Sequence, residues 1–227
     1  MPEPKRKFAT PTDYFQLRRF VQISESHCGP AVIQMLLSNL GVEISQEAVA
    51  EAGEAADLIE LHGMRVDQLA KAVCQLVPSA QFWYKHHASL DDLISLIIEH
   101  LCPVGVEWQG FFEDEDEAED DEDEEETEDE EDDEDKDDFG HYSVVTHIDR
   151  EKQEMIIVDP YKTFMERDHI LSFDEFAPRW WDTNEITNPQ TGRTRYVKDT
   201  RMMFIVTPKE ALFPKTLGMK RAAASLH

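Results

Sequence analysis

The sequence predicts one α+β domain in which helices come first and an antiparallel sheet follows. Three observations support this fold class. The chain has 227 residues, 41% of them hydrophobic, which is enough for one core but a stretch for two. Helical periodicity dominates residues 28–101. Short apolar segments separated by turns, which are typical of strands, dominate residues 104–206.

The first helix is predicted over residues 28–40, where apolar residues recur at helical spacing: Val32, Ile33, Leu36, Leu37 and Leu40. A short helix is predicted over 45–53 with Ser45 as its N-cap, and a longer one with a single apolar face over 66–76. An amphipathic helix is expected from Ser89 to about Leu101, and a short one over 172–180.

Five segments are predicted as strands, namely 80–84, 104–108, 142–148, 155–158 and 202–206. The polar residues 149–152 separate the third strand from the fourth and indicate a hairpin turn. We therefore expect these two strands to lie side by side.

Residues 113–138 contain 23 of the 49 acidic residues and one lysine, and Ala118 is their only apolar side chain. Such a run cannot bury enough apolar surface to offset its ordering entropy, so we predict a disordered insertion. The rest of the chain carries 26 acidic and 21 basic residues, which disfavours nucleic-acid binding through a basic surface. The predicted organisation is a lead-in (1–20), one domain (21–207) and a tail (208–227).

No segment has the length or apolar character of a signal peptide or a membrane span. The three cysteines are few and odd in number, which argues against a disulfide framework and for reduced thiols. We therefore expect a cytoplasmic protein with no membrane partner.

Cys28 is the candidate nucleophile, because a helix N-terminus and a neighbouring imidazolium both favour a thiolate. Gln22, on the loop that enters the helix, could join the backbone N–H of Cys28 in an oxyanion hole. His141 opens the third strand and is the candidate base. Asp159 ends the fourth strand, so the predicted hairpin would bring it beside His141 to orient the imidazole.

Several motifs resemble the papain-like cysteine peptidases related to the bacteriocin-processing double-glycine peptidases, in a stand-alone form. The resemblance runs from about residue 21 to 181. Its specific parts are Gln22-x5-Cys28-Gly29-Pro30, the segment 63–69 (GMRVDQL), Pro103-Val104, the segment 140–145 (GHYSVV) and Val158-Asp159-Pro160. It implies a papain-like fold and a triad of Cys28, His141 and Asp159, with Gln22 in the oxyanion hole.

The sequence departs from the family pattern at two places. His27 stands where the family often has aspartate, and the acidic insertion directly precedes the segment that contains His141. The membrane and ATPase regions of the exporter-linked members do not occur here, so a role in leader-peptide export does not carry over.

Other reactive residues have simpler interpretations. Cys74 and Cys102 fall on or beside predicted helices and are expected to be structural. His86, His87, His100 and Cys102 match no zinc spacing, so we predict neither a metal nor any other cofactor. The remaining histidines, His27, His147 and His169, are interpreted as surface or packing residues, and Trp180-Trp181 as core or a groove wall.

The predicted function is hydrolysis of peptide bonds by a cysteine peptidase or amidase through a thioester, with a peptide or protein as substrate. The acidic insertion is interpreted first as a solvated loop that keeps the protein soluble. The alternative is that it attracts basic substrates to the cleft or screens it as a pseudo-substrate. Two alternatives stay open at this point. One is a catalytically silent binding module whose acidic loop engages a basic protein, and the other is an acyltransferase that uses the same thioester.

Overall fold

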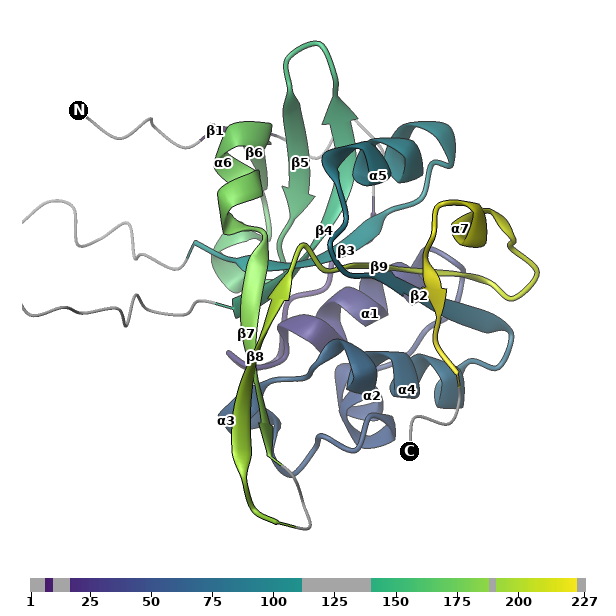
Figure 1. Ribbon diagram of the computed structural model, residues 1–227, viewed down its shortest axis with the longest axis vertical. Coiled ribbons are helices and arrows are strands. Elements are labelled where there is room, and N and C mark those ends of the chain that lie inside the picture. Colours follow the sequence, from purple (N-terminus) through teal and green to yellow (C-terminus); the bar gives the residue numbers. More distant parts are fainter. Residues whose placement is uncertain (1–6, 10–16, 112–139, 188–190, 224–227) are drawn as a thin grey trace, which may run out of the picture.

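An eight-stranded antiparallel sheet runs through the molecule, with helices on both of its faces (Figure 1). The computed structural model describes residues 7–9, 17–111, 140–187 and 191–223. The strand order is β1-β6-β5-β4-β3-β9-β2-β10. The strands are β1 (Lys7–Ala9), β2 (Ala80–Lys85), β3 (Val104–Gln109), β4 (Gly140–Asp149), β5 (Glu154–Val158), β6 (Asp168–Ser172), β9 (Met203–Pro208) and β10 (Lys220–Arg221). This mixture of helices and a large antiparallel sheet confirms the predicted α+β class.

The central strands are buried on both faces, because successive side chains of a strand point to opposite sides of the sheet. Phe82 and Val144 belong to one apolar cluster, whereas their neighbours Trp83 and Val145 belong to the other. The two clusters therefore form two core layers on either side of one sheet.

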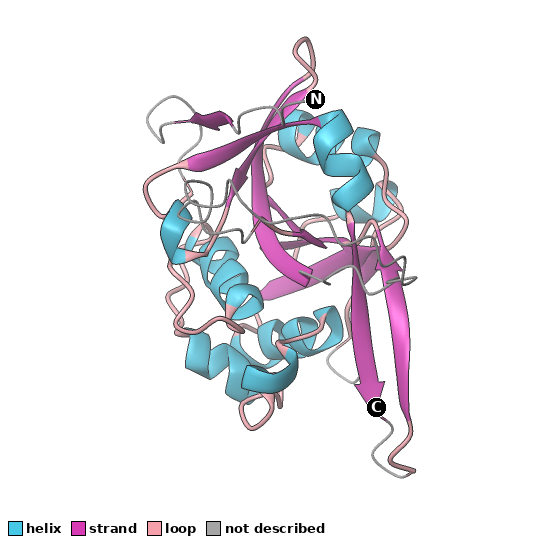
Figure 2. Cartoon of the chain, turned by 90° about the vertical axis from the view of Figure 1, so that its left-hand side faces the viewer, coloured by secondary structure: helices cyan, strands magenta, loops and turns pink. Residues whose placement is uncertain are grey.

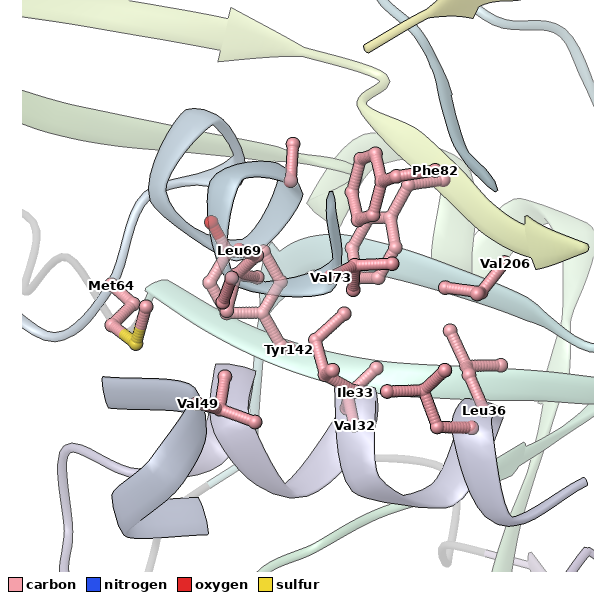
Figure 3. Packing of buried hydrophobic residues seen from close by; sticks show 14 of the residues in the cluster. Val32, Ile33, Leu36, Val49, Met64, Leu69, Val73, Phe82, Tyr142 and Val206 are labelled. Carbon is pink, nitrogen blue, oxygen red and sulfur yellow. The ribbon is translucent and has the colours of Figure 1, made fainter. Parts of the chain in front are cut away.

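The first core layer is covered by three helices: α1 (Cys28–Ser38), α2 (Gln46–Ala52) and α4 (Val66–Leu76). Figure 3 shows Ile33, Leu69 and Val73 from these helices packed toward Phe82 and Tyr142 of the sheet. All three helices lie where the sequence predicts them. The Ser45 side chain accepts a hydrogen bond from the Ala48 amide, which confirms the predicted N-cap of α2.

The second core layer lies under α5 (Leu90–Ile94) and α6 (Phe173–Phe176). The helix predicted over 89–101 is shorter than expected, because α5 passes into a π-helical turn over Ser95–Glu99. Likewise, the helix predicted over 172–180 consists of α6 and a 3₁₀ turn over Ala177–Arg179.

Several elements have no counterpart among the predicted ones. They are α3 (Ile59–His62), β1, β6, a separate hairpin of β7 (Trp181–Thr187) and β8 (Thr194–Thr200), and α7 (Phe213–Thr216) with β10. The hairpin extends from the main sheet on the side where α3 lies (Figure 1), and its two long strands are seen from another side in Figure 2. β1 lies in the segment expected as a lead-in and pairs with β6, and β10 lies in the expected tail and pairs with β2. The acidic insertion, 113–138, lies outside the described residues.

Candidate active site

Cys28 is the first residue of α1, the helix that packs directly on the sheet. Its neighbour Gly29 allows this close approach, since a Cβ there would lie 3.2 Å from the Leu69 side chain and 3.3 Å from the Tyr142 ring. Pro30 is tolerated because the first-turn N–H groups of a helix have no intrahelical partner. The thiol is thus fixed at the end of a helix whose free N–H groups can stabilise negative charge.

His141 and Asp159 meet in the hairpin formed by β4 and β5. These strands pair antiparallel with Val144 opposite Val158, so the beginning of β4 lies beside the end of β5. His141 Nε2 is 2.9 Å from Asp159 Oδ1, and both side chains are buried. The structure thus brings together two residues that are 18 positions apart in the sequence.

The Asp159 carboxylate accepts hydrogen bonds on both of its oxygens. Oδ1 accepts from His141 and, at 2.8 Å, from the Tyr161 amide, while Oδ2 accepts from the Ser143 hydroxyl at 3.1 Å. His169 Nε2 is 3.9 Å from Oδ2. Burial alone would raise the pKa of Asp159, but the charges and hydrogen bonds around it, those of His141 first, lower the pKa.

His141 lies between Asp159 and Cys28, and both neighbours favour its protonated form. Burial is the largest single effect on its pKa and lowers it, but the Asp159 charge and hydrogen bond and the hydrogen bond and charge of Cys28 together raise the pKa to about 10. Since Asp159 occupies Nε2, Nδ1 is the ring nitrogen left for the Cys28 thiol. Thiol, imidazole and carboxylate are therefore linked in series.

Gln22 lies on the loop that enters α1, and its side-chain amide faces that loop. Nε2 donates to the backbone carbonyls of Ser24 and Glu25, at 3.0 and 3.1 Å. The Gln22 backbone N–H donates to the Pro160 carbonyl at 2.9 Å, which ties this loop to the end of β5. Donation from Nε2 to a substrate would require one of the two carbonyl bonds to be exchanged.

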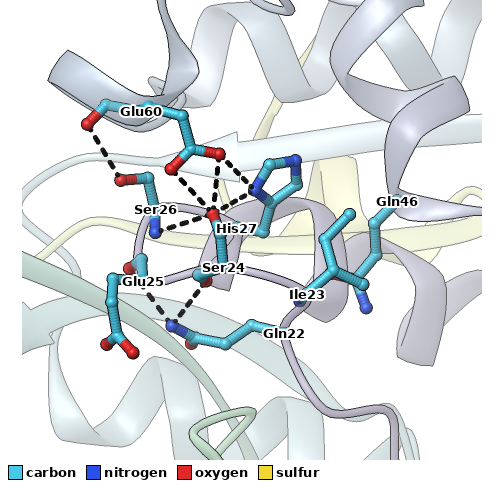
Figure 4. A network of polar contacts seen from close by, with 8 residues as sticks. All are labelled: Gln22, Ile23, Ser24, Glu25, Ser26, His27, Gln46 and Glu60. Carbon is cyan, nitrogen blue, oxygen red and sulfur yellow. Dashed lines mark hydrogen bonds and ion pairs between the residues drawn. The ribbon is translucent and has the colours of Figure 1, made fainter.

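A polar network anchors the same loop to α3 (Figure 4). The Ser24 hydroxyl donates to the Glu60 carboxylate at 2.9 Å and lies 2.7 Å from His27 Nδ1. Because a hydroxyl has one proton, which Glu60 accepts here, His27 Nδ1 must be the donor to Ser24. His27 therefore has a structural role in bracing the loop next to Cys28.

A groove of about 790 Å³ opens at Cys28. Residues 54–65, which follow α2 and include α3, form one wall together with Gln68 on α4, and β7 and β8 form the other. Exposed apolar side chains line both walls: Leu58 and Leu61 on the first and Tyr196 on the second. The dimensions and mixed lining suit an extended peptide that passes across the thiol.

A buried glutamate stands behind this groove in the middle of β3. Glu107 accepts a 2.5 Å hydrogen bond from the Tyr142 hydroxyl and one at 3.3 Å from the Asn184 amide. Burial raises the pKa of Glu107, and the nearby Asp199 charge raises it further. Glu107 is not among the residues predicted from the sequence, although a glutamate inside an otherwise apolar strand candidate is a signal that could have found it.

Neither Cys74 nor Cys102 is among the residues that line the groove at Cys28. Burial raises the pKa of Cys102 to about 12 and also raises that of Cys74, so neither favours the thiolate. Within the described ranges, no group of three or more His, Cys, Asp or Glu side chains is arranged to hold a metal ion. Trp180 is buried in the second core layer and donates to the Met202 carbonyl at 2.8 Å.

Comparison with known proteins identifies similar sequences and folds. The family model described as the Peptidase_C39-like family matches residues 14–187. No curated protein matches the chain.

Among solved structures, the peptidase domain of Streptococcus ComA, a bifunctional ABC transporter involved in quorum sensing, has 15% identity and a TM-score of 0.51. This match covers 86% of the present chain and all of that domain. A C39-like peptidase from Bacillus anthracis has 12% identity and a TM-score of 0.50, covering 89% of this chain and 100% of that one. A double-glycine-motif protease from an AMS/PCAT transporter has 14% identity and a TM-score of 0.49, covering 89% and 99%. Identities this low reflect a shared fold.

Proposed function

This chain belongs to the peptidase C39-like family, and we propose that it hydrolyses peptide bonds with Cys28 as nucleophile, His141 as acid and base, and Asp159 as the residue that orients His141. The observation that carries the proposal is the position of the buried His141 imidazole between Asp159 and the Cys28 thiol. A papain-like fold with a thiol at a helix N-terminus supports the same chemistry.

In the proposed reaction the Cys28 thiolate attacks the substrate carbonyl carbon and forms a C–S bond. The backbone N–H of Cys28 would stabilise the oxyanion. Gln22 Nε2 would add a second hydrogen bond once it gives up one of the two loop carbonyls to which it donates. His141 gives its proton to the amine as the C–N bond breaks. It then takes a proton from water, which attacks the thioester carbonyl; the C–S bond breaks and releases the acid and the Cys28 thiolate, beside a protonated His141.

A peptide or protein is the proposed substrate, and the charges of the groove favour a basic one. Among its carboxylates, Glu54 pairs with Lys71, whereas Glu25 and Glu185 have no ion pair within the described parts of the chain. The one groove arginine, Arg65, is already paired with Asp67. A lysine or arginine side chain in the groove would therefore meet uncompensated negative charge.

The catalytic proposal is tested by incubating the protein with mixed synthetic peptides and identifying products by mass spectrometry. We expect cleavage by the wild type and none by Cys28→Ala or His141→Ala, while circular dichroism shows that both variants fold. Cys74→Ala is the matched control. Burial raises the pKa of the Cys74 thiol and so disfavours its thiolate, and this substitution should leave cleavage unchanged. Equal cleavage by Cys28→Ala and wild type would refute the proposal.

The preference for basic substrates is tested with peptide pairs that differ only by Lys or Glu. Glu185→Lys should reduce the preference for the Lys peptide by about two- to fivefold, the effect of one exposed charge pair. Glu151→Lys, in the β4–β5 turn, is the control. Deletion of residues 113–138 measures the separate contribution of the acidic insertion. This deletion should weaken the ionic-strength dependence of cleavage of basic peptides. A preference unaffected by Glu185→Lys would contradict the role of the groove.

All three cysteines are free in the structure. This supports the proposal that the protein works in a reducing compartment, the cytoplasm. Among the described residues, no helix has the length and apolar character needed to cross a membrane.

A further inference from the structure

A chain of buried hydrogen bonds ends on the Asp159 carboxylate. Trp108 Nε1 donates to the Ser143 hydroxyl at 3.0 Å, and that hydroxyl donates to Asp159 Oδ2 at 3.1 Å. Trp108 and Ser143 are both fully buried. They lie on adjacent strands, Trp108 on β3 beside His141 and Ser143 on β4 two residues after it.

The direction of this chain is fixed by the chemistry of its members. An indole N–H can only donate a hydrogen bond, so the Ser143 oxygen must be its acceptor. The single Ser143 proton is then directed at Asp159, and an ionised carboxylate can only accept it. Reversal of the chain would leave a buried donor or acceptor unpaired, which costs more than a hydrogen bond contributes.

We infer that Ser143, held by Trp108, is a positioning residue that fixes the Asp159 carboxylate against His141. This inference rests on the proposed triad. Because Ser143 holds Oδ2 while Tyr161 and His141 share Oδ1, the carboxylate cannot rotate without breaking a bond. An ionised Asp159 with a fixed plane keeps the His141 ring pointing at Cys28.

The surroundings of Asp159 keep this arrangement away from water. His169 lies on the side of Oδ2, with its ring 4.1 Å from the Phe164 ring and 6.4 Å from that of Trp108, centre to centre. The titratable groups that face the carboxylate are therefore His141 on β4, His169 on β6 and, through His141, Cys28 on α1. In such a low-dielectric setting one directed hydroxyl has a large effect on a carboxylate.

The test uses Ser143→Ala and Trp108→Phe, with Trp83→Phe as a matched control. Trp83 Nε1 donates to the Thr207 hydroxyl at 3.1 Å, which is a second buried indole–hydroxyl bond, on β2 and β9. One readout is the pH profile of Cys28 alkylation by iodoacetamide, followed by mass spectrometry. The other is the exchange rate with water of the His141 Nε2–H proton, measured by NMR.

We expect Ser143→Ala to move the acid limb of alkylation up by about one pH unit, because a carboxylate that loses a donor to its charged form is protonated more easily. The Nε2–H proton should exchange about tenfold faster. Trp108→Phe should have a smaller effect of the same kind, and none when added to Ser143→Ala. Trp83→Phe should change neither readout, although it removes a comparable buried bond.

The inference is overturned if Ser143→Ala behaves as Trp83→Phe does in both readouts. It is also overturned if the effects of Ser143→Ala and Trp108→Phe simply add. Failure of the proposed function has a different signature, namely wild-type alkylation of Cys28 no faster than that of Cys74 and Cys102. The NMR readout would still decide the role of Ser143 in that case.

Discussion

The two sides of the candidate site are built in different ways. On the side of the base, neighbouring strands of one sheet hold His141, Asp159 and Ser143 in a buried chain of hydrogen bonds. On the side of the nucleophile, the loop from Gln22 to His27 makes most of its polar contacts with itself and with α3. Strand register thus fixes the proposed base, whereas a loop fixes the proposed oxyanion donor, Gln22.

This difference suggests a division between a preformed part and an adjustable part. Buried, fully hydrogen-bonded groups resist rearrangement because each broken bond leaves an unpaired polar atom. The Gln22 amide, by contrast, must exchange a carbonyl of its own loop before it can donate to a substrate. We therefore expect changes on the base side to affect stability and activity together, and changes in the loop to affect activity alone.

The largest effect is expected for Asp159→Ala. The buried Ser143 hydroxyl and Tyr161 amide lose their acceptor and His141 loses its ion-pair partner, so the free energy of unfolding should fall by about 3–5 kcal/mol. Denaturant unfolding at pH 7 measures this change. Asp149→Ala is the control, because the Asp149 carboxylate lies at the turn of the same hairpin. Its loss should lower the free energy of unfolding far less. Equal losses would mean that the base side is no more fixed than a surface turn.

The second effect is a pH dependence of stability that arises from His141. Its pKa is raised from 6.5 to about 10 on folding, so its stabilising contribution is complete below pH 6.5 and is lost as the pH rises through 10. We expect the free energy of unfolding to decrease over this range by a few kcal/mol. His141→Gln should flatten the profile between these two pH values, and a profile equally steep in that variant would assign the dependence to other groups.

The third effect concerns activity without stability. Gln22→Ala should reduce peptide cleavage by about a hundred- to a thousandfold if Nε2 stabilises the oxyanion. Gln46→Ala is the matched control, because Gln46 also braces this loop, through Val21 and Ile23, but from α2. Cleavage kinetics should show a large loss for Gln22→Ala alone. Similar losses of cleavage in the two variants would mean that Gln22 only stabilises the loop and does not bind the oxyanion.

How much the sequence predicts follows the same division. The hairpin that joins His141 and Asp159 could be predicted because a short polar turn between two apolar strands fixes their pairing. The residues that surround Asp159 could not be predicted from the sequence. Trp108 and His169 lie on strands whose positions in the sheet depend on long-range pairing. Their contribution becomes visible only once the strand order is known.

The walls of the groove could not be predicted from the sequence for a different physical reason. β7 and β8 are rich in polar and charged residues and are stabilised by pairing with each other, so their intrinsic strand signal is weak. α3 has only four residues, too few to show helical periodicity. Sequence patterns therefore located the candidate reacting groups but not the walls of the groove beside them.

The smallest effect is expected for Glu60→Gln, which tests whether the loop is the adjustable part. Loss of the charged acceptor of Ser24 should loosen residues 22–27 by about 1 kcal/mol, or roughly fivefold in amide hydrogen exchange. Exchange at 141–145 should stay unchanged, because strand pairing protects those amides. Glu51→Gln, an exposed change on α2, is the control. If exchange increased equally in both segments, loop and sheet would open as one unit, and the division between an adjustable loop and a fixed base would fail.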